Sequence, residues 1–287
     1  MLRRCFRAMG TDIELALDGD DSTESWTAMA RAEREIERLE RMLSRFIEGS
    51  DLSRLNLAGC LVAPPELVQI VITAMGLRGE TGGLFDPTVH DAMLAAGYDR
   101  PFDTMPPEDL RASLAPAEGG GAVACDPATG FVMLGAGTRL DLGGIAKGFA
   151  ADRAADLLGE IGPCVVNLGG EVVVRGGPWP IGIESDTQPL VIALVEGAVA
   201  TSGRDRRRWT RGGREHHHVI DPRTGRPADT DLLRATVIAA DGARADALAT
   251  ALLVAGRDRA LAMVERLGLA AILQTPDGVI DSRLVVA

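Results

Sequence analysis

The sequence predicts an α+β fold in which strands and helices are interspersed. First, 46% of its 287 residues are hydrophobic and its mean hydropathy is +0.09, so the chain can bury a large core. Second, apolar runs of strand length alternate with longer segments of helical periodicity. Third, this alternation lacks the regular β-α-β order of a doubly wound sheet. We therefore expect mixed sheets with packed helices in a single domain, residues 1–287.

The N-terminal half shows one strand and two helices. Residues 12–17 alternate apolar and polar side chains, which predicts a half-buried strand. Residues 23–46 carry an apolar stripe at spacings of three and four, which predicts a long helix. A second helix is predicted over 66–80, since prolines precede it and a glycine pair follows it. Residues 98–128 are rich in Pro, Gly and Asp and indicate an irregular insertion.

Short strands dominate from residue 130 onwards. Apolar runs bounded by Gly, Pro and Asp predict strands at 130–134, 138–142, 164–167, 171–175, 180–184, 190–195, 198–201 and 234–239. Helical periodicity predicts helices at 145–161, 243–255 and 257–267.

Composition excludes several classes of protein. The net charge of −11 and the pI of about 4.9 argue against a non-specific nucleic-acid binder, but they leave a small anionic ligand possible. The four cysteines contain no C-x-x-C pair, so we expect neither a zinc site nor a disulfide scaffold, and free thiols fit a reducing compartment. No apolar run approaches the roughly 18 residues of a membrane span.

The N-terminal residues indicate a location. Basic residues occur there, but no apolar run of a secretory signal and no lipobox cysteine follows them. We therefore expect a cytoplasmic protein; the alternative is an exported protein whose leader has been removed.

The junction at 138–158, TRLDLGGIAKGFAADRAADLL, combines an acid, two glycines and a lysine at a helix start. It matches neither the Walker pattern nor G-x-G-x-x-G. Free backbone N–H groups at a helix N-terminus can still bind an anion. The positive charge of Lys147 is unfavourable in the first turn of a helix, at the positive end of the helix dipole. Lys147 therefore needs an anionic partner, which is either another residue of the protein or a ligand.

Asp246 and Thr250 stand four residues apart, so they share one face of the helix predicted at 243–255. Carboxylate and hydroxyl oxygens suit Mg²⁺ or Ca²⁺. The alternative is that Asp246 caps the helix or lies in its first turn, and the spacing by itself favours that alternative.

Two other polar runs have structural alternatives. His216, His217 and His218 alternate sides on a strand, so they cannot readily bind one metal ion, but His218 could act as a base beside the turn that follows. The arginine-rich run 204–208 is explained equally well as a solvated loop or as a partner for the excess acid.

Eight motifs in a fixed order give these weak signals a common interpretation. They are AMGTDIEL, MLSRFIEGSDLSRLN, GGLFDPTV, LDLGGIAKGFAADRA, VVNLGGEV, ATSG, HVIDPRTGRP and VIAADGARADALATALLVAG. From about residue 6 to the C-terminus, the chain resembles the ApbE family, the FAD:protein FMN transferases.

The resemblance implies a T-fold-like chain that binds FAD together with a divalent metal, usually Mg²⁺. The enzyme would transfer the FMN part of FAD to a Thr or Ser hydroxyl of an acceptor flavoprotein and release AMP. Two alternatives stay open: an FAD pyrophosphatase, and a non-catalytic FAD-binding accessory protein.

The resemblance also assigns residues. It implies a metal site made of the Gly144 carbonyl, Asp246 and Thr250, which reverses the capping interpretation. His218 is the candidate catalytic base, and Asp246 is the alternative acid–base group. The implied FAD-binding residues are Met9, Phe46, Ala95, Ala96, Gly97, Asp141, Lys147 and Ile220. The chain departs from the family pattern at Ala96, where a Trp is usual, at Ala249, where some relatives add an acid, and in the run 204–208.

Overall fold

A computed structural model describes residues 1–111, 114–185 and 190–283, and it is built around one antiparallel sheet of eight strands. The strands lie in the order β1-β2-β7-β8-β11-β16-β17-β18. Their bounds are β1 Leu2–Ala8, β2 Thr11–Leu17, β7 Cys164–Leu168, β8 Glu171–Arg175, β11 Gly197–Gly203, β16 Arg234–Ala239, β17 Ala270–Thr275 and β18 Gly278–Arg283.

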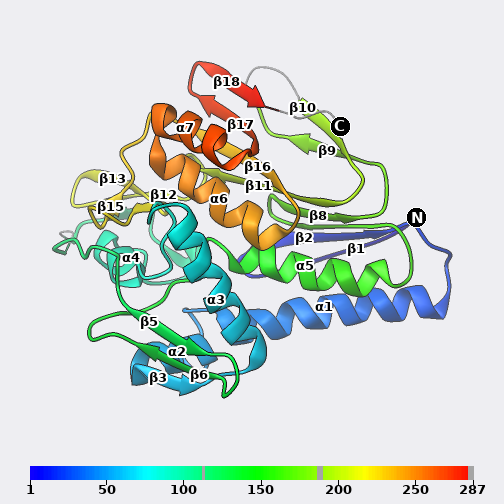
Figure 1. Cartoon of the computed structure of the whole chain (residues 1–287), viewed down its shortest axis with the longest axis horizontal. Helices are drawn as coiled ribbons and strands as arrows, with labels where there is room; N and C mark the ends of the chain where they lie inside the picture. Colours follow the sequence, from blue (N-terminus) through cyan, green and yellow to red (C-terminus); the bar gives the residue numbers. More distant parts are fainter. Residues whose placement is uncertain (112–113, 186–189, 284–287) are drawn as a thin grey trace.

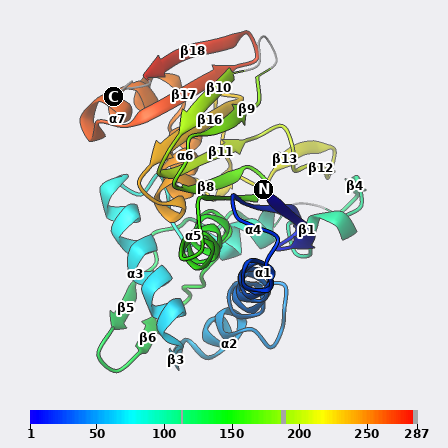
Figure 2. The same cartoon turned by 90° about the vertical axis from the view of Figure 1, so that its right-hand side faces the viewer.

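Helices cover one face of this sheet (Figure 1). They are α1 Thr23–Leu43, α3 Pro65–Glu80, α5 Ala146–Gly159, α6 Gly242–Ala255 and α7 Arg257–Leu267. Helix α5 packs on β7 and β8, and α6 packs on β11 and β16. Figure 2 shows α1 and α5 end-on, with α1 against the side of α5 that faces away from the sheet. No helix in the described part of the chain has the length and apolar character needed to cross a membrane.

A hairpin covers part of the opposite face of the sheet. It consists of β9 (Trp179–Ile183) and β10 (Leu190–Leu194). Val172 and Val174 of β8 pack with Ile181 of β9, whereas Val173 points to the helix side and joins the main core. Because both faces of β8 are buried, its three central residues, 172–174, are all valine and do not alternate with polar residues.

The remaining elements are short and lie around the sheet and helices. They are α2 Asp51–Ala58, β3 Cys60–Val62, α4 His90–Ala96, the 3-10 helix η1 Phe102–Thr104, β4 Glu108–Asp109, β5 Val123–Asp126, β6 Phe131–Leu134, β12 Arg208–Arg211, β13 Arg214–His217, β14 Ile220–Asp221 and β15 Arg226–Pro227. Within the predicted irregular segment 98–128, the described residues form η1, β4 and β5.

The predicted mixed helix and sheet architecture is confirmed, and most predicted elements are found within a few residues of their expected ends. The sequence prediction missed β1, β17 and β18 of the large sheet, the helices α2 and α4, and several of the short elements around them, among them β3, β5 and β12. The helix predicted over 23–46 ends at Leu43, because the backbone becomes extended at Ser44. This early end places Arg45 and Phe46 in a loop, where they are free to turn toward the cavity described below.

The strand predicted at 138–142 is wrong. Among the described residues, this segment belongs to no strand of any sheet. The side chain of Asn56 replaces a partner strand: Leu140 N donates to Asn56 Oδ1 at 2.7 Å, and Asn56 Nδ2 donates to Leu140 O at 2.8 Å. Asp141 N donates to Pro87 O at 2.8 Å. The apolar alternation is still explained, since Leu140 and Leu142 are buried.

Helices α5 and α6 each hold the N-terminus of the other. The Asp152 carboxylate of α5 accepts the N–H groups of Gly242 and Ala243 at 2.7 and 3.0 Å. In return, Asp246 Oδ2 of α6 accepts the Gly148 N–H of α5 at 3.4 Å. Both contacts place a carboxylate at the positive end of a helix dipole. The antiparallel crossing therefore fixes the position of Asp246 against the start of α5.

Replacing Asp152 with Asn is expected to change how stability depends on pH. Burial raises the pKa of Asp152 from 3.8 to about 6. The folded state thus retains a proton that the unfolded state releases, so the free energy of unfolding falls as pH rises from about 4 to about 6. A shift of about two units corresponds to roughly 3 kcal/mol. Urea titrations across this pH range should show that the free energy of unfolding falls with rising pH in the wild type and falls less in Asp152→Asn. If the free energy of unfolding has the same pH dependence in both proteins, the prediction is contradicted.

Candidate active site

A cavity of about 570 Å³ lies beside the N-terminus of α5 and the middle of α6. Its wall combines the β1–β2 turn, the loop after α1, the junction before α5, and the loop between β11 and β12. The volume is in the usual range of small-molecule sites, roughly 300–1,000 Å³. The structure brings together nine of the predicted site residues on this wall: Met9, Phe46, Asp141, Gly144, Lys147, His218, Ile220, Asp246 and Thr250.

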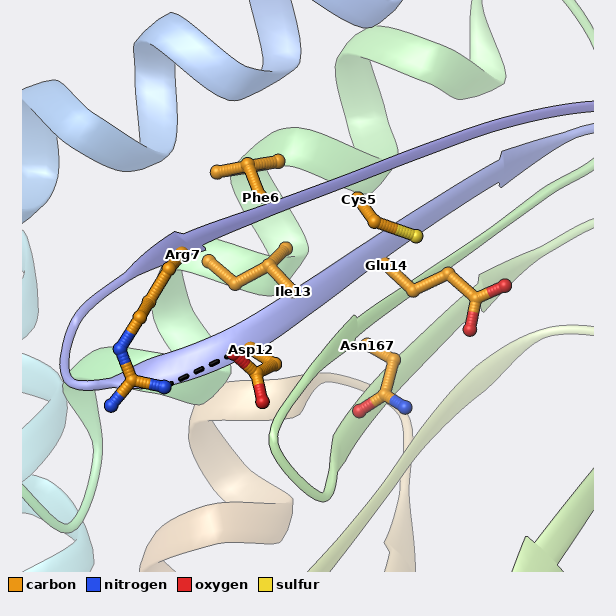
Figure 3. A pocket seen from close by; sticks show the side chains of 7 residues that line it. All are labelled: Cys5, Phe6, Arg7, Asp12, Ile13, Glu14 and Asn167. Carbon is orange, nitrogen blue, oxygen red and sulfur yellow. Dashed lines mark hydrogen bonds and ion pairs between the residues drawn. The ribbon is translucent and has the colours of Figure 1, made fainter.

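A second hollow, of about 540 Å³, lies over β1, β2 and β7 (Figure 3). None of the predicted site residues lines it. Arg7 and Asp12, two of its charged side chains, already pair with each other at 3.0 Å. Its lining consists of Cys5, Phe6, Arg7, Asp12, Ile13, Glu14 and Asn167. The cavity beside α5 is therefore the candidate active site.

Lys147 of α5 lies between two carboxylates. Its Nζ is 2.5 Å from Glu171 Oε1 of β8 and 3.6 Å from Asp246 Oδ2 of α6. Burial alone would lower the pKa of Lys147, but the charges of Asp246 and Glu171 more than offset it, so the pKa is raised and the ammonium stays protonated. The anionic partner required by the sequence is thus supplied by the protein. Sequence reasoning missed Glu171 as a site residue, although it lies in the motif VVNLGGEV, because only the fold brings β8 to this point.

Oxygen donors gather next to Lys147. Thr250 Oγ1 lies 3.0 Å from Ser202 Oγ of β11. A Cβ added at Gly144 would lie 3.3 Å from Thr250 Oγ1, so the backbone of the glycine junction passes close to that hydroxyl. Burial raises the pKa of Asp246 to about 7, although Lys147 acts in the opposite direction.

The capping alternative for Asp246 is wrong, because Asp241 caps α6 and its side chain accepts the Arg244 N–H.

These donors fit a hard divalent cation. Carboxylate, hydroxyl and backbone carbonyl oxygens are the ligands that Mg²⁺ accepts, usually together with water and substrate phosphates. Groups of three or more His, Cys, Asp or Glu side chains able to hold a metal are absent from the described residues. A transition-metal centre would need such a group, whereas Mg²⁺ does not.

Aromatic side chains, Phe46 and Tyr98, also line the cavity. The guanidinium carbon of Arg45 lies 4.1 Å from the centroid of the Phe46 ring and 4.7 Å from that of Tyr98. Arg45 Nε also pairs with Asp141 Oδ2 at 2.6 Å, and Arg45 Nη1 donates to Tyr98 O at 2.8 Å. Phe46 is 36% exposed, so part of its ring is free to stack on a planar ligand. Sequence reasoning missed Arg45 and Tyr98, although Arg45 adjoins Phe46 in the chain.

Met9 reaches the cavity from the β1–β2 turn. It has φ = +52°, a left-handed conformation that is unfavourable for a residue with a Cβ, and Gly10 follows at +69°. The Met9 N–H donates to Glu40 Oε1 at 2.7 Å, which holds the turn against α1. Both Met9 and Glu40 line the cavity. The unfavourable backbone thus lies at the site, where such strain is common.

The three adjacent histidines have three different environments. His216 stacks on Trp209 with ring centroids 6.1 Å apart, and His217 Nε2 lies 3.1 Å from Ala228 O. His218 follows β13 and lines the cavity. Burial and the charge of Arg207 lower the pKa of His218 to about 3, so its ring is neutral near pH 7. Only His218 of the three is placed to act on a ligand.

Several buried polar atoms at this cavity have no hydrogen-bond partner among the described residues. They are Arg45 Nη2, Glu171 Oε2 and His218 Nδ1. An unsatisfied buried polar atom is costly, and such atoms are rare in stable interiors. Their concentration on one wall indicates a site that completes its hydrogen bonds with a polar ligand.

Comparison with known families decides the assignment. The profile of the ApbE family matches residues 9–273. The chain belongs to the ApbE family. The resemblance seen in the eight motifs is thereby confirmed.

Relatives within the ApbE family carry a consistent name. A protein of Rhodobacter capsulatus named FAD:protein FMN transferase is 32% identical over 95% of this chain, which spans about half (55%) of that relative. The Escherichia coli K12 protein of the same name is 28% identical, over 95% of this chain and 83% of its own length. The Haemophilus influenzae protein has the same name and is 30% identical, over 95% of this chain and 86% of its own length.

Solved ApbE structures share the fold. The ApbE protein of Thermotoga maritima superposes with a TM-score of 0.82 at 26% identity, covering 98% of this chain and 97% of that one. The flavin transferase ApbE of Vibrio cholerae gives a TM-score of 0.77 at 26% identity, covering 97% and 95%.

The structure does not place Ala95, Ala96 and Gly97 on the cavity wall, and Ala96 stands where the ApbE pattern usually has a Trp. Ala96 is buried and its carbonyl accepts the Trp209 Nε1–H at 3.0 Å. A Cβ at Gly97 would lie 2.4 Å from Nη1 of Arg211, so that arginine fills the space beside it. Tyr98, the next residue, lines the cavity instead. Small side chains at 95–97 admit Trp209 and Arg211 behind the wall, and the FAD contacts implied for these three residues stay a prediction.

Proposed function

We propose that this protein transfers the FMN part of FAD to a Thr or Ser hydroxyl of an acceptor flavoprotein and releases AMP in an Mg²⁺-dependent reaction. The observation that carries the proposal is the convergence of Asp246, Thr250, Gly144 and His218 on the wall of one cavity that Phe46 and Tyr98 also line. A ligand that combines a flat ring system with a charged pyrophosphate matches that lining. Relatives across the ApbE family bear the name of this activity.

The proposed metal ligands are the Asp246 carboxylate, the Thr250 hydroxyl and the Gly144 carbonyl. When bound, Mg²⁺ would neutralise negative charge on the pyrophosphate. The chain's own contribution is positional: Lys147 pairs with Asp246 and Glu171 and holds these carboxylates in place. Phosphoryl transfer depends mainly on such positioning and on charge neutralisation.

The transfer step balances without a further reactant. The acceptor hydroxyl oxygen forms a bond to the phosphorus of the FMN half, and the bond from that phosphorus to the bridging oxygen breaks, leaving AMP. The hydroxyl proton must leave with a base. We assign that role to His218, because its imidazole is the histidine ring that lies on the cavity wall. Asp246 is the alternative acid–base group.

The test is to incubate the purified protein with FAD and Mg²⁺, with and without a flavoprotein domain that carries a target threonine. AMP is measured by chromatography, and the acceptor is weighed by mass spectrometry. We expect AMP release and an acceptor mass increased by one FMN, both abolished by EDTA. AMP with free FMN in the absence of acceptor would identify a pyrophosphatase instead. Tight FAD binding with no AMP in either mixture would identify an accessory protein.

A further inference from the structure

Five cationic side chains line the cavity, and four of them are already paired with carboxylates. Lys147 faces Glu171 and Asp246, as described above. Arg45 pairs with Asp141 at 2.6 Å. The cavity-lining cations are Arg7, Arg45, Lys147, Arg206 and Arg207.

Arg7 and Arg206 form the two remaining ion pairs. Arg7 pairs with Asp12 at 3.0 Å and also with Asp103. Arg206 pairs with Glu184. The described residues place no carboxylate within ion-pair distance of Arg207. Arg207 is therefore the cavity-lining cation whose charge is not committed to the protein.

Arg207 is half-buried, and its charge affects the titratable groups His218 and Lys147 of the cavity. Its charge lowers the pKa of the neighbouring His218 and acts in the same direction on Lys147. It also acts on the hydroxyl of Tyr98. Arg207 therefore lines the same cavity as His218, Lys147 and Tyr98 and is close enough to act on all three.

An anionic ligand needs such a group here. The protein carries a net charge of −11, and two carboxylates face the single ammonium of Lys147. A pyrophosphate gains little from a cation that is already neutralised. A guanidinium without a carboxylate partner can donate two parallel hydrogen bonds to phosphate oxygens.

We propose that Arg207, rather than Lys147, is the side chain that binds the pyrophosphate of FAD. This inference rests on the proposed function. It gives the arginine-rich loop 204–208 a role that the solvated-loop interpretation did not, and it makes Lys147 a positioning residue for Glu171 and Asp246. Arg206 and Arg208, which flank Arg207, are exposed and paired with Glu184 and Glu215.

The test compares Arg207→Gln with the matched control Arg208→Gln, whose side chain pairs with Glu215 at 2.7 Å and does not line the cavity. Binding of FAD and of riboflavin, which has the same ring system without phosphates, is measured by flavin fluorescence in the absence of Mg²⁺. Hydrogen bonds to charged groups predict that Arg207→Gln weakens FAD binding about 10- to 100-fold. We expect riboflavin binding to be unchanged, Arg208→Gln to behave as wild type, and Arg207→Lys to recover part of the loss.

Four other results would overturn the inference. Unchanged FAD affinity in Arg207→Gln would overturn it, and if wild type still transfers FMN the proposed function would stand. An equal loss for FAD and riboflavin would indicate a structural role, as would an equal loss in Arg208→Gln. Failure of wild type to bind FAD would overturn both proposals. Circular dichroism of each variant establishes that it is folded.

Discussion

Replacing Asp246 with Ala is expected to lower Mg²⁺-dependent FAD turnover by at least about 1,000-fold. Asp246 supplies the carboxylate of the proposed oxygen-donor set with Thr250 and Gly144, and a divalent cation held only by neutral oxygens would bind weakly. The fold should survive, since Lys147 keeps its 2.5 Å contact to Glu171. Turnover is measured as AMP release across a Mg²⁺ titration, and unfolding is followed in parallel.

The Thr250 position provides the matched control for this prediction. Thr250→Ser keeps the hydroxyl that lies 3.0 Å from Ser202 Oγ, whereas Thr250→Val removes it at nearly equal volume. We expect the serine variant to retain Mg²⁺ dependence and the valine variant to require more Mg²⁺. Wild-type turnover in Asp246→Ala, at any Mg²⁺ concentration, would contradict the metal assignment.

The sequence predicted more of the main framework than of the site's detailed contacts. Most strands of the large sheet and its five covering helices follow from local periodicity, which depends on neighbours in the chain. The segment 138–142 shows where this reasoning fails. Its alternation is that of a strand, but the partner of its backbone is the side chain of Asn56, 84 residues away. No local pattern distinguishes these two ways of satisfying an extended backbone.

The site shows the same division. Nine of the predicted site residues lie on one wall of the cavity. They could be identified from the sequence because each occupies a motif with a fixed position in the chain. Glu171, Arg45 and Arg207 were missed as site residues, since their roles depend on which charges the fold brings near them. Glu171 matters because β8 runs beside the start of α5. Arg207 matters because the residues that the structure describes place no carboxylate in an ion pair with it. Charge pairing across elements is a tertiary property.

The crossing of α5 and α6 connects stability with chemistry. Gly148 and Gly242 meet where the two helices cross, and the carboxylates of Asp152 and Asp246 cap the opposite helix on either side of that contact. Only residues without a Cβ allow the backbones to approach so closely. The same approach brings Asp246 to Lys147 at 3.6 Å. A change that separates the helices should therefore weaken both the fold and the site.

Replacing Gly148 with Ala is expected to lower the free energy of unfolding by about 3 kcal/mol or more. The added Cβ would lie 2.1 Å from the carbonyl oxygen and 2.3 Å from the carbonyl carbon of Gly242. Both are backbone atoms, so no side-chain rotation can relieve the contact and the helices must move apart. Equilibrium unfolding in urea, followed by far-UV circular dichroism, measures the loss.

Gly76→Ala in α3 is the matched control, because it makes the same chemical change inside a helix. Gly76 is exposed, and a Cβ there would meet nothing within 4 Å. Alanine has the higher helix propensity, so this variant should gain about 0.5–1 kcal/mol. The two substitutions are thus expected to change the free energy of unfolding in opposite directions, and the difference is due to the helix crossing alone. A Gly148→Ala protein as stable as wild type would show that the crossing tolerates a wider spacing, and the proposed coupling between helix approach and the position of Asp246 would then fail.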